Sequence, residues 1–183
     1  TRTPHMQEMI IEAIRVSLMN YNRVVILKEK DSNRFLPIWI GAAEADAITL
    51  KKQGVKVSRP MTHDLLANVI GELGSSVQRI VVSDISDDTF IARIYLTRNG
   101  EDLQIDSRTS DAIALAVRTD APIFCEDEVL DQAGVVLDED GSIVDAGGEP
   151  PARRLPVREE ELEGMSAFRD FIDGLDLDDF GES

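Results

Sequence analysis

The side chains that could carry out acid–base or metal chemistry gather in and beside three short segments of the sequence. These segments are Leu36–Gly41, Arg59–Asp64 and Asp106–Arg118, and each joins an apolar run to a stretch with helical periodicity. The ionisable residues there are one histidine, four acids and three arginines: His63, Glu44, Asp64, Asp106, Asp111, Arg59, Arg108 and Arg118. Because each segment is a junction between two elements, we expect these side chains to converge on one groove.

The histidine and the acids point to two kinds of chemistry. His63 can act as a general base, as a metal ligand, or as a neutral residue hydrogen-bonded in the first turn of a helix, and these readings stay open. Asp106 ends an apolar run and Asp111 begins the next helical stretch, so both can face one groove. With Glu44 they form a candidate site for Mg²⁺ or Mn²⁺, which prefer oxygen ligands. In the competing, structural reading, Asp111 serves the helix N-terminus and Asp106 pairs with a neighbouring arginine.

The arginines and the remaining acid also have two readings each. Arg59, Arg108 and Arg118 can bind phosphate oxygens and stabilise the charge of a phosphoryl transition state, or they can form structural ion pairs. Asp64 can take part in catalysis beside the histidine, or it can favour the positive end of a helix dipole. The sequence has no glycine-rich phosphate loop, no paired-cysteine metal site and no HExxH motif, so no single motif decides between these readings.

Taken together and in order, the three segments resemble those of the bifunctional nuclease domain family, over roughly residues 9–135. The departure is Thr109, where the family pattern has proline; threonine can replace it by capping the following helix. The resemblance implies a nuclease of low sequence specificity that hydrolyses phosphodiester bonds of both DNA and RNA. In the mechanism we expect, a divalent ion is held by Asp106, Asp111 and Glu44, while His63 relays the proton and an arginine braces the phosphate.

The net charge of the whole chain argues against a nucleic-acid partner, but the net charge of its first part does not. The whole sequence has a net charge of −16, which by itself argues against binding phosphates. Residues 1–124 hold 15 Lys and Arg against 16 Asp and Glu, a net of −1, whereas residues 125–183 hold 4 against 19, a net of −15. A locally basic groove is therefore compatible with the first part. The acidic remainder motivates an alternative function, a non-enzymatic oligomeric scaffold or regulatory module that recruits a protein partner.

Hydrophobic periodicity predicts an α+β fold, with a mostly antiparallel, curved sheet and helices packed on one face. Strands are expected over residues 7–18, 23–27, 35–40, 77–82, 90–96, 103–105 and 122–125. Helices are expected over residues 42–53, 62–73, 111–118 and 126–132. We expect Gly54 and Gly74 to end the first two helices, and Thr62 and Ser110 to cap the second and third.

The chain divides into one domain and appended segments. We expect an N-terminal addition, a bifunctional-nuclease-like domain, a linker and an acidic amphipathic tail, over residues 1–5, 6–136, 137–156 and 157–183. Apolar residues recur in the tail at three- and four-residue spacing, which is typical of a helix that packs on another surface. The tail is therefore expected to support assembly, or to bind a protein partner through residues 157–180.

The remaining features concern location and assembly. The single cysteine, Cys125, lies in an apolar run and is expected to be buried and structural. The sequence has no apolar run long enough to span a membrane and no signal-peptide pattern, so we expect a cytoplasmic protein without a membrane partner. Pro37 cannot donate to a strand ladder and suggests a strand end or a sheet edge. Apolar strands with such an edge predict a homo-oligomer, and specifically a dimer.

Overall fold

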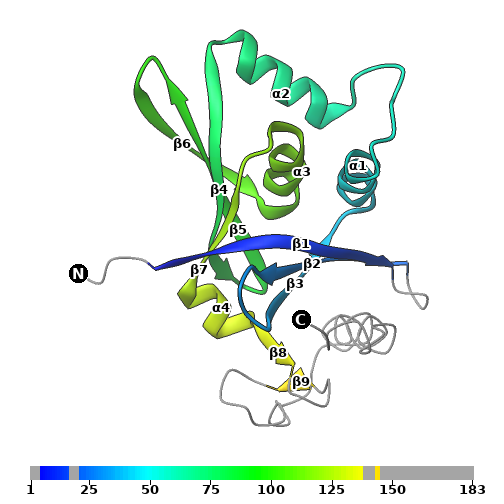
Figure 1. Ribbon diagram of the computed structural model, residues 1–183, viewed down its shortest axis with the longest axis vertical. Coiled ribbons are helices and arrows are strands. Elements are labelled where there is room, and N and C mark those ends of the chain that lie inside the picture. Colours follow the sequence, from blue (N-terminus) through cyan, green and yellow to red (C-terminus); the bar gives the residue numbers. More distant parts are fainter. Residues whose placement is uncertain (1–4, 17–20, 138–142, 145–183) are drawn as a thin grey trace, which may run out of the picture.

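The computed structural model describes residues 5–16, 21–137 and 143–144, and it confirms the predicted α+β class. Within these residues, nine strands form one sheet in the order β6-β5-β4-β7-β1-β2-β3-β8-β9 (Figure 1). The strands are β1 (Met6–Val16), β2 (Arg23–Glu29), β3 (Arg34–Ile40), β4 (Ser75–Ser86), β5 (Thr89–Arg98), β6 (Glu101–Arg108), β7 (Ile123–Glu126), β8 (Val135–Leu137) and β9 (Ile143–Val144). The helices are α1 (Ala42–Lys52), α2 (Thr62–Glu72), α3 (Thr109–Thr119) and α4 (Asp127–Ala133).

The sheet consists of two antiparallel groups of strands that β7 joins in the middle. One group is β1, β2, β3, β8 and β9, and the other is β4, β5 and β6. Strand β7 pairs antiparallel with β1 and parallel with β4, where Ile123 lies opposite Ile80. This is the only parallel pair among the described strands. A parallel pair needs a long crossover connection, and the β5–β6 hairpin together with α3 supplies it.

Helix α3 is the centre of the helical layer. Its residues 112–116 are almost completely buried and belong to the same core cluster as Ile80 and Ile94 of the sheet. Helices α1 and α2 both pack on α3, which itself lies against β4 and β5. Figure 1 shows these three helices together above β1, as predicted, whereas α4 lies below it and contacts β4 and β7. The starts of α2 and α3 are thereby brought close to α1.

Glycine ends the first two helices, as the sequence predicts. Gly54 follows α1 with φ +67°, and Gly74 follows α2 with φ +72°. Glycine adopts this left-handed conformation without the steric cost that a Cβ would add. The turn at Gly74 leads directly into β4, so α2 and β4 are held side by side by a short connection.

The predicted cap of α2 is wrong by one residue. Helix α2 begins at Thr62 and its N-cap is Met61 rather than Thr62. A carboxylate inside the first turn takes over the role of the cap: the backbone N–H of Met61 donates to Oδ2 of Asp64 at 2.8 Å. Asp64 thus satisfies one of the backbone donors that a helix start leaves open.

The predicted cap of α3 is also wrong. The helix begins at Thr109 and its N-cap is Arg108, whose side chain makes no capping hydrogen bond, so Ser110 already lies inside the helix. The hydroxyl of Thr109 is buried and has no hydrogen-bond partner in the described part of the chain. Thr109 therefore does not replace the expected proline by capping. It occupies the first helical position, where proline is favoured.

Several further expectations can be compared with the structure. Cys125 is buried in β7, and burial raises the pKa of its thiol to about 12, which agrees with a structural role. Strand β8 pairs only with Arg34 and Phe35 of β3, so Pro37 lies where β3 has no second partner among the described strands. The short strands β8 and β9 were not predicted. No helix in the described residues is long and apolar enough to cross a membrane. The amphipathic tail over 157–183 lies outside the described residues.

Candidate active site at the helix junction

Four of the predicted residues form one connected chain of polar contacts between three elements. Nε2 of His63 on α2 lies 2.9 Å from Oδ1 of Asp111 on α3. The other oxygen of Asp111 accepts from Nε of Arg108 at 2.8 Å, and Nη2 of Arg108 donates to Oε1 of Glu44 at 2.7 Å. The chain His63–Asp111–Arg108–Glu44, here called the junction network, therefore links α2, the start of α3 and α1. This convergence of the junctions was predicted.

The charges of the junction network stabilise one another. Burial alone would raise the pKa of Asp111, but hydrogen bonds from His63 and Arg108 outweigh it, so this pKa lies below its usual range. The hydrogen bond to Asp111, its charge and the contact with Glu44 raise the pKa of Arg108. Asp111 is thus an anion at neutral pH, and Arg108 is a permanent cation between two carboxylates.

The surroundings of the junction network differ along its length. His63 is 6% exposed and belongs to the few buried polar residues. The side chain of Arg108 is 68% exposed, although both carboxylates that hold it are largely covered. Because an ionised carboxylate can only accept hydrogen bonds, the neutral ring of His63 carries its proton on Nε2, and Nδ1 is the nitrogen that can accept a proton.

A second ion pair lies beside the junction network and is more deeply buried. Nε of Arg118 at the end of α3 donates to Oδ1 of Asp64 at 2.7 Å. Two further nitrogens of Arg118 donate to the backbone carbonyls of Ala114 and Ala47, at 2.8 and 3.1 Å. The hydrogen bond from Met61 and the contact with Arg118 lower the pKa of Asp64, although burial opposes the shift. Arg118, with its side chain 4% exposed, thus joins α3 to both α1 and α2.

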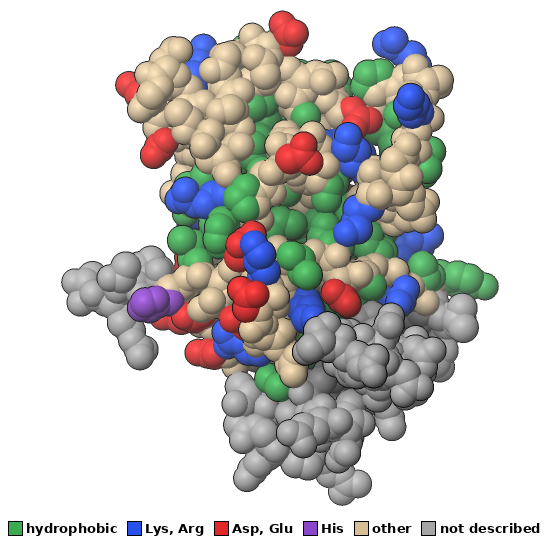
Figure 2. Space-filling model, viewed as in Figure 1, with side chains coloured by type: hydrophobic (Ala, Val, Ile, Leu, Met, Phe, Trp, Pro, Cys, Tyr) green, Lys and Arg blue, Asp and Glu red, His purple; other side chains and the backbone are tan. Residues whose placement is uncertain are grey.

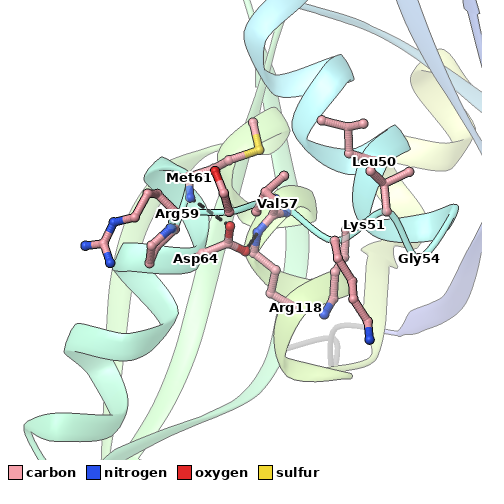
Figure 3. A pocket seen from close by; sticks show the side chains of 12 residues that line it. Leu50, Lys51, Gly54, Val57, Arg59, Met61, Asp64 and Arg118 are labelled. Atoms are coloured by element: carbon pink, nitrogen blue, oxygen red, sulfur yellow. Dashed lines mark hydrogen bonds and ion pairs between the residues drawn. The ribbon is translucent and has the colours of Figure 1, made fainter.

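Two predicted site residues do not join these networks. Asp106 lies exposed on β6, opposite Arg93 of β5. Its neighbour Ile105 pairs with the core residue Ile94, so strand alternation places Asp106 on the other face of the sheet, away from α3. Arg59 is exposed in the connection between α1 and α2, and in Figure 3 its side chain extends away from the Asp64 carboxylate.

The predicted metal ligands do not form a ready metal site as they are arranged. Glu44 and Asp111 are on the same side of the molecule, but the guanidinium of Arg108 lies between them and hydrogen-bonds to both. Asp106, the third predicted ligand, faces away. No cluster of three or more His, Cys, Asp or Glu side chains in the described residues could hold a metal ion. The donor set therefore does not fit a divalent ion without movement of Arg108.

A hollow of about 580 Å³ opens beside the buried ion pair, at the connection between α1 and α2 (Figure 3). Asp64 and Arg118 form one wall. The other lining residues come from the end of α1 and from the connection itself: Leu50, Lys51, Gly54, Val55, Lys56, Val57, Ser58, Arg59, Pro60 and Met61. Of these, only Arg59 was predicted as a site residue. The sequence did mark the rest of this stretch, because residues 51–60 contain several Lys and Arg and no Asp or Glu. The strongly negative net charge of the whole chain does not reveal this local excess of positive charge.

Comparison with known proteins agrees with the family that the three segments resemble. Residues 25–138 match the bifunctional nuclease domain. An uncharacterized protein of Mycobacterium tuberculosis (strain H37Rv) is 37% identical over 175 residues, which is 96% of this chain and 98% of that protein.

Plant proteins match over a shorter stretch. Bifunctional nuclease 1 of Oryza sativa subsp. japonica is 24% identical over 106 residues, 56% of this chain and 32% of the rice protein. Bifunctional nuclease 2 of Arabidopsis thaliana is 26% identical over 113 residues, covering 58% of this chain and 34% of its own length. Residues 25–138, which match the family, contain α1, α2 and α3 with both ion-pair networks. The chain belongs to the bifunctional nuclease domain family.

Proposed function

We propose that this protein is a nuclease of low sequence specificity that hydrolyses phosphodiester bonds of DNA and RNA at the junction network. The contact between His63 and Asp111 is the observation that carries the proposal. A carboxylate on one ring nitrogen fixes the tautomer and orientation of an imidazole, and it stabilises the ring once the other nitrogen has taken a proton. His63 would remove a proton from the attacking water through Nδ1, and Asp111 would hold the ring.

Arg108 would bind the phosphate. Its guanidinium is the exposed member of the junction network, and Nη1 makes no hydrogen bond in the described part of the chain. Glu44 and Asp111 fix its position, so its remaining donors point outward without a large loss of side-chain entropy on binding. A fixed cation at this place would stabilise the negative charge that gathers on the phosphoryl oxygens in the transition state.

The proposal contains no step through a metal ion, because Arg108 occupies the space between two of the three predicted ligands. Dependence on Mg²⁺ or Mn²⁺ remains a prediction from the family, and it would require Arg108 to release Glu44 and Asp111. A cytoplasmic location also remains a prediction from the sequence.

A nuclease assay with matched variants tests the proposal. Single-stranded RNA and DNA are incubated with the full chain in Mg²⁺, in Mn²⁺ and in EDTA, beside H63A, D111N and D106N prepared identically. We expect H63A and D111N to lose at least about 100-fold in rate, since a positioned acid–base group contributes on that order. D106N serves as the control, because Asp106 faces away from the junction.

The outcomes separate the competing readings. Equal cleavage in the wild type and in all variants would point to contamination and would overturn the proposal, as would no cleavage under any condition. If D106N loses as much activity as D111N, the metal site predicted from the sequence is favoured over the junction network. If H63A loses stability but retains its rate, His63 only ties α2 to α3.

An assembly role is the second candidate function, and exposed apolar side chains favour it. Large apolar side chains are exposed on α2 and at its C-cap: Leu65, Leu66, Val69 and Leu73. Leu103 and Ile105 on the edge strand β6 are also exposed, at 39% and 47%. Apolar residues on an edge strand favour pairing between chains, so we propose a homodimer. Light scattering that gives a monomer mass at high micromolar concentration would contradict it. Binding of a protein partner through residues 157–180 concerns residues outside those described.

A further inference from the structure

The connection between α1 and α2 is the most basic stretch of the chain. Residues 51–60 contain Lys51, Lys52, Lys56 and Arg59 and no acid, and no ten-residue stretch elsewhere in the sequence holds four basic residues. All ten residues are exposed. In Figure 2, basic side chains stand at the upper right, over this connection. In a chain with a net charge of −16, such a run concentrates positive potential in one place.

The charges of this stretch are not neutralised by the fold. Arg108 and Arg118 are held by carboxylates, and Arg34 contacts three of them. By contrast, Lys56 and Arg59 make no ion pair or hydrogen bond through their side chains within the described residues. The fold therefore uses the more buried Arg34 and Arg118 for structure and leaves Lys56 and Arg59 for an anionic ligand.

The hollow beside these cations has a mixed lining that suits a nucleotide. Three basic side chains, Lys51 at the end of α1 and Lys56 and Arg59 in the connection, line it together with the Asp64–Arg118 pair, whose charges cancel. Its apolar part includes Val55 and Val57, which are 47% and 43% exposed. Cations can hold backbone phosphates while apolar side chains contact bases or sugars. The lining contains no aromatic residue for stacking and no buried amide for reading base edges, so binding would not depend on sequence.

The hollow lies on the same two helices as the candidate active site. Asp64, which lines it, directly follows His63 in α2, and Arg118, which closes it, is on the same helix as Asp111. We propose that Lys51, Lys56 and Arg59 bind successive backbone phosphates of single-stranded nucleic acid and lead the strand toward His63. This inference rests on the proposed function for the identity of its ligand, and it assigns strand binding to residues outside the junction network.

Binding measured without cleavage tests the inference on the full chain. Fluorescence anisotropy with labelled single-stranded oligothymidylate and oligouridylate is recorded in EDTA over a series of salt concentrations. We expect K56A/R59A to weaken binding at least about tenfold at low salt and to reduce the salt slope by about 1.4, since each phosphate contact to a single strand contributes about 0.7. The exchange K56R/R59K keeps both charges and should bind within about threefold of the wild type.

A second control separates local charge from net charge. K30A/R98A also removes one lysine and one arginine, namely exposed Lys30, which follows β2 and pairs with Glu8, and exposed Arg98, the last residue of β5, and should change the dissociation constant less than about threefold. An equal loss of affinity in K56A/R59A and K30A/R98A would overturn the proposed binding groove, because the change in net charge alone would then explain the loss. No binding by the wild type at low salt would also overturn it.

Cleavage by the same preparations distinguishes failure of the inference from failure of the proposed function. If the wild type cleaves through His63 while K56A/R59A keeps its dissociation constant and KM, the groove is wrong and the nuclease stands. If K56A/R59A loses binding but the wild type cleaves under no condition, the groove stands and the nuclease is wrong.

Discussion

Arg108 and Arg118 begin and end the same helix region, and each holds a carboxylate that was predicted as a catalytic residue. The side chain of Arg108 is 68% exposed, whereas that of Arg118 is 4% exposed. The guanidinium of Arg118 donates to Asp64 and to two backbone carbonyls, so all three of its partners are parts of the helical layer. Arg108 contacts only two carboxylates and keeps part of its guanidinium toward solvent. The two ion pairs have similar distances, but we expect Arg118 to stabilise the fold and Arg108 to bind phosphate. The burial of each arginine, more than the distance to its carboxylate, distinguishes the two pairs.

The largest expected effect comes from breaking the buried pair. Arg118→Ala should lower the free energy of unfolding by roughly 3 kcal/mol, because it leaves the Asp64 carboxylate without its guanidinium partner and removes two hydrogen bonds to backbone carbonyls of α1 and α3. Urea unfolding measures the loss. Arg118→Lys is the matched control: it keeps the charge but cannot reproduce three hydrogen bonds in one plane, so we expect an intermediate value. A loss below about 1 kcal/mol would mean that the two arginines do not differ as burial suggests.

Replacement of the exposed Arg108 should affect the cleavage rate much more than the stability. Arg108→Ala should lower the cleavage rate about 100-fold, as removal of a fixed donor to a developing negative charge does. Its effect on unfolding should stay within about 1 kcal/mol, since exposed ion pairs contribute little. Both quantities are measured on one preparation. A variant that is strongly destabilised and fully active would contradict the assignment of Arg108 to phosphate binding.

Acid should weaken the Asp64–Arg118 contact in a predictable window. Because the pKa of Asp64 is lowered by folding, its contribution to stability is complete above the unfolded pKa of about 4 and is lost as pH falls through the lower, folded pKa. Asp64→Asn should therefore be less stable than the wild type at pH 7, and the difference should shrink below pH 4. Urea unfolding at pH 7, 4 and 3 measures it, and a constant difference would contradict the prediction.

The smallest expected effect concerns the residue that follows Arg108. The Thr109 hydroxyl is buried without a partner in the described part of the chain, so Thr109→Val replaces an unsatisfied polar group by a methyl group of similar size. We expect a gain of about 1 kcal/mol in the free energy of unfolding. Thr109→Ser keeps the hydroxyl and serves as the control. A loss in Thr109→Val would show that the hydroxyl has a partner, and that the start of α3 is more tightly bound than its contacts suggest.

Local rules predicted the parts of the fold that depend on neighbouring residues. The apolar periodicity of α2 and the glycines at 54 and 74 were sufficient for the helices and their ends, because a helix end needs only a left-handed residue nearby. The parallel pairing of β4 with β7 was not predictable in this way. It joins segments about forty residues apart, and nothing in either strand identifies its partner.

For the candidate site, the sequence predicted which residues come together but not how they pair. Junctions between elements brought Glu44, His63, Arg108 and Asp111 together, as expected. The sequence did not predict which carboxylate pairs with each arginine, because several carboxylates lie at comparable distances along the chain. It also could not show that Asp106 faces away from the helices, since that depends on the register of β6 on β5.

The place of β1 in the sheet has a consequence for the order in which the protein can fold during synthesis. One edge of β1 pairs with β2, which leaves the ribosome soon afterwards, but residues 6–9 on its other edge pair with residues 123–126 of β7. The first strand to be made therefore waits for nearly the whole domain before its second neighbour exists. During that interval the β1–β3 group has an open edge of unpaired backbone N–H and C=O groups, and a chaperone that covers extended strands would protect it.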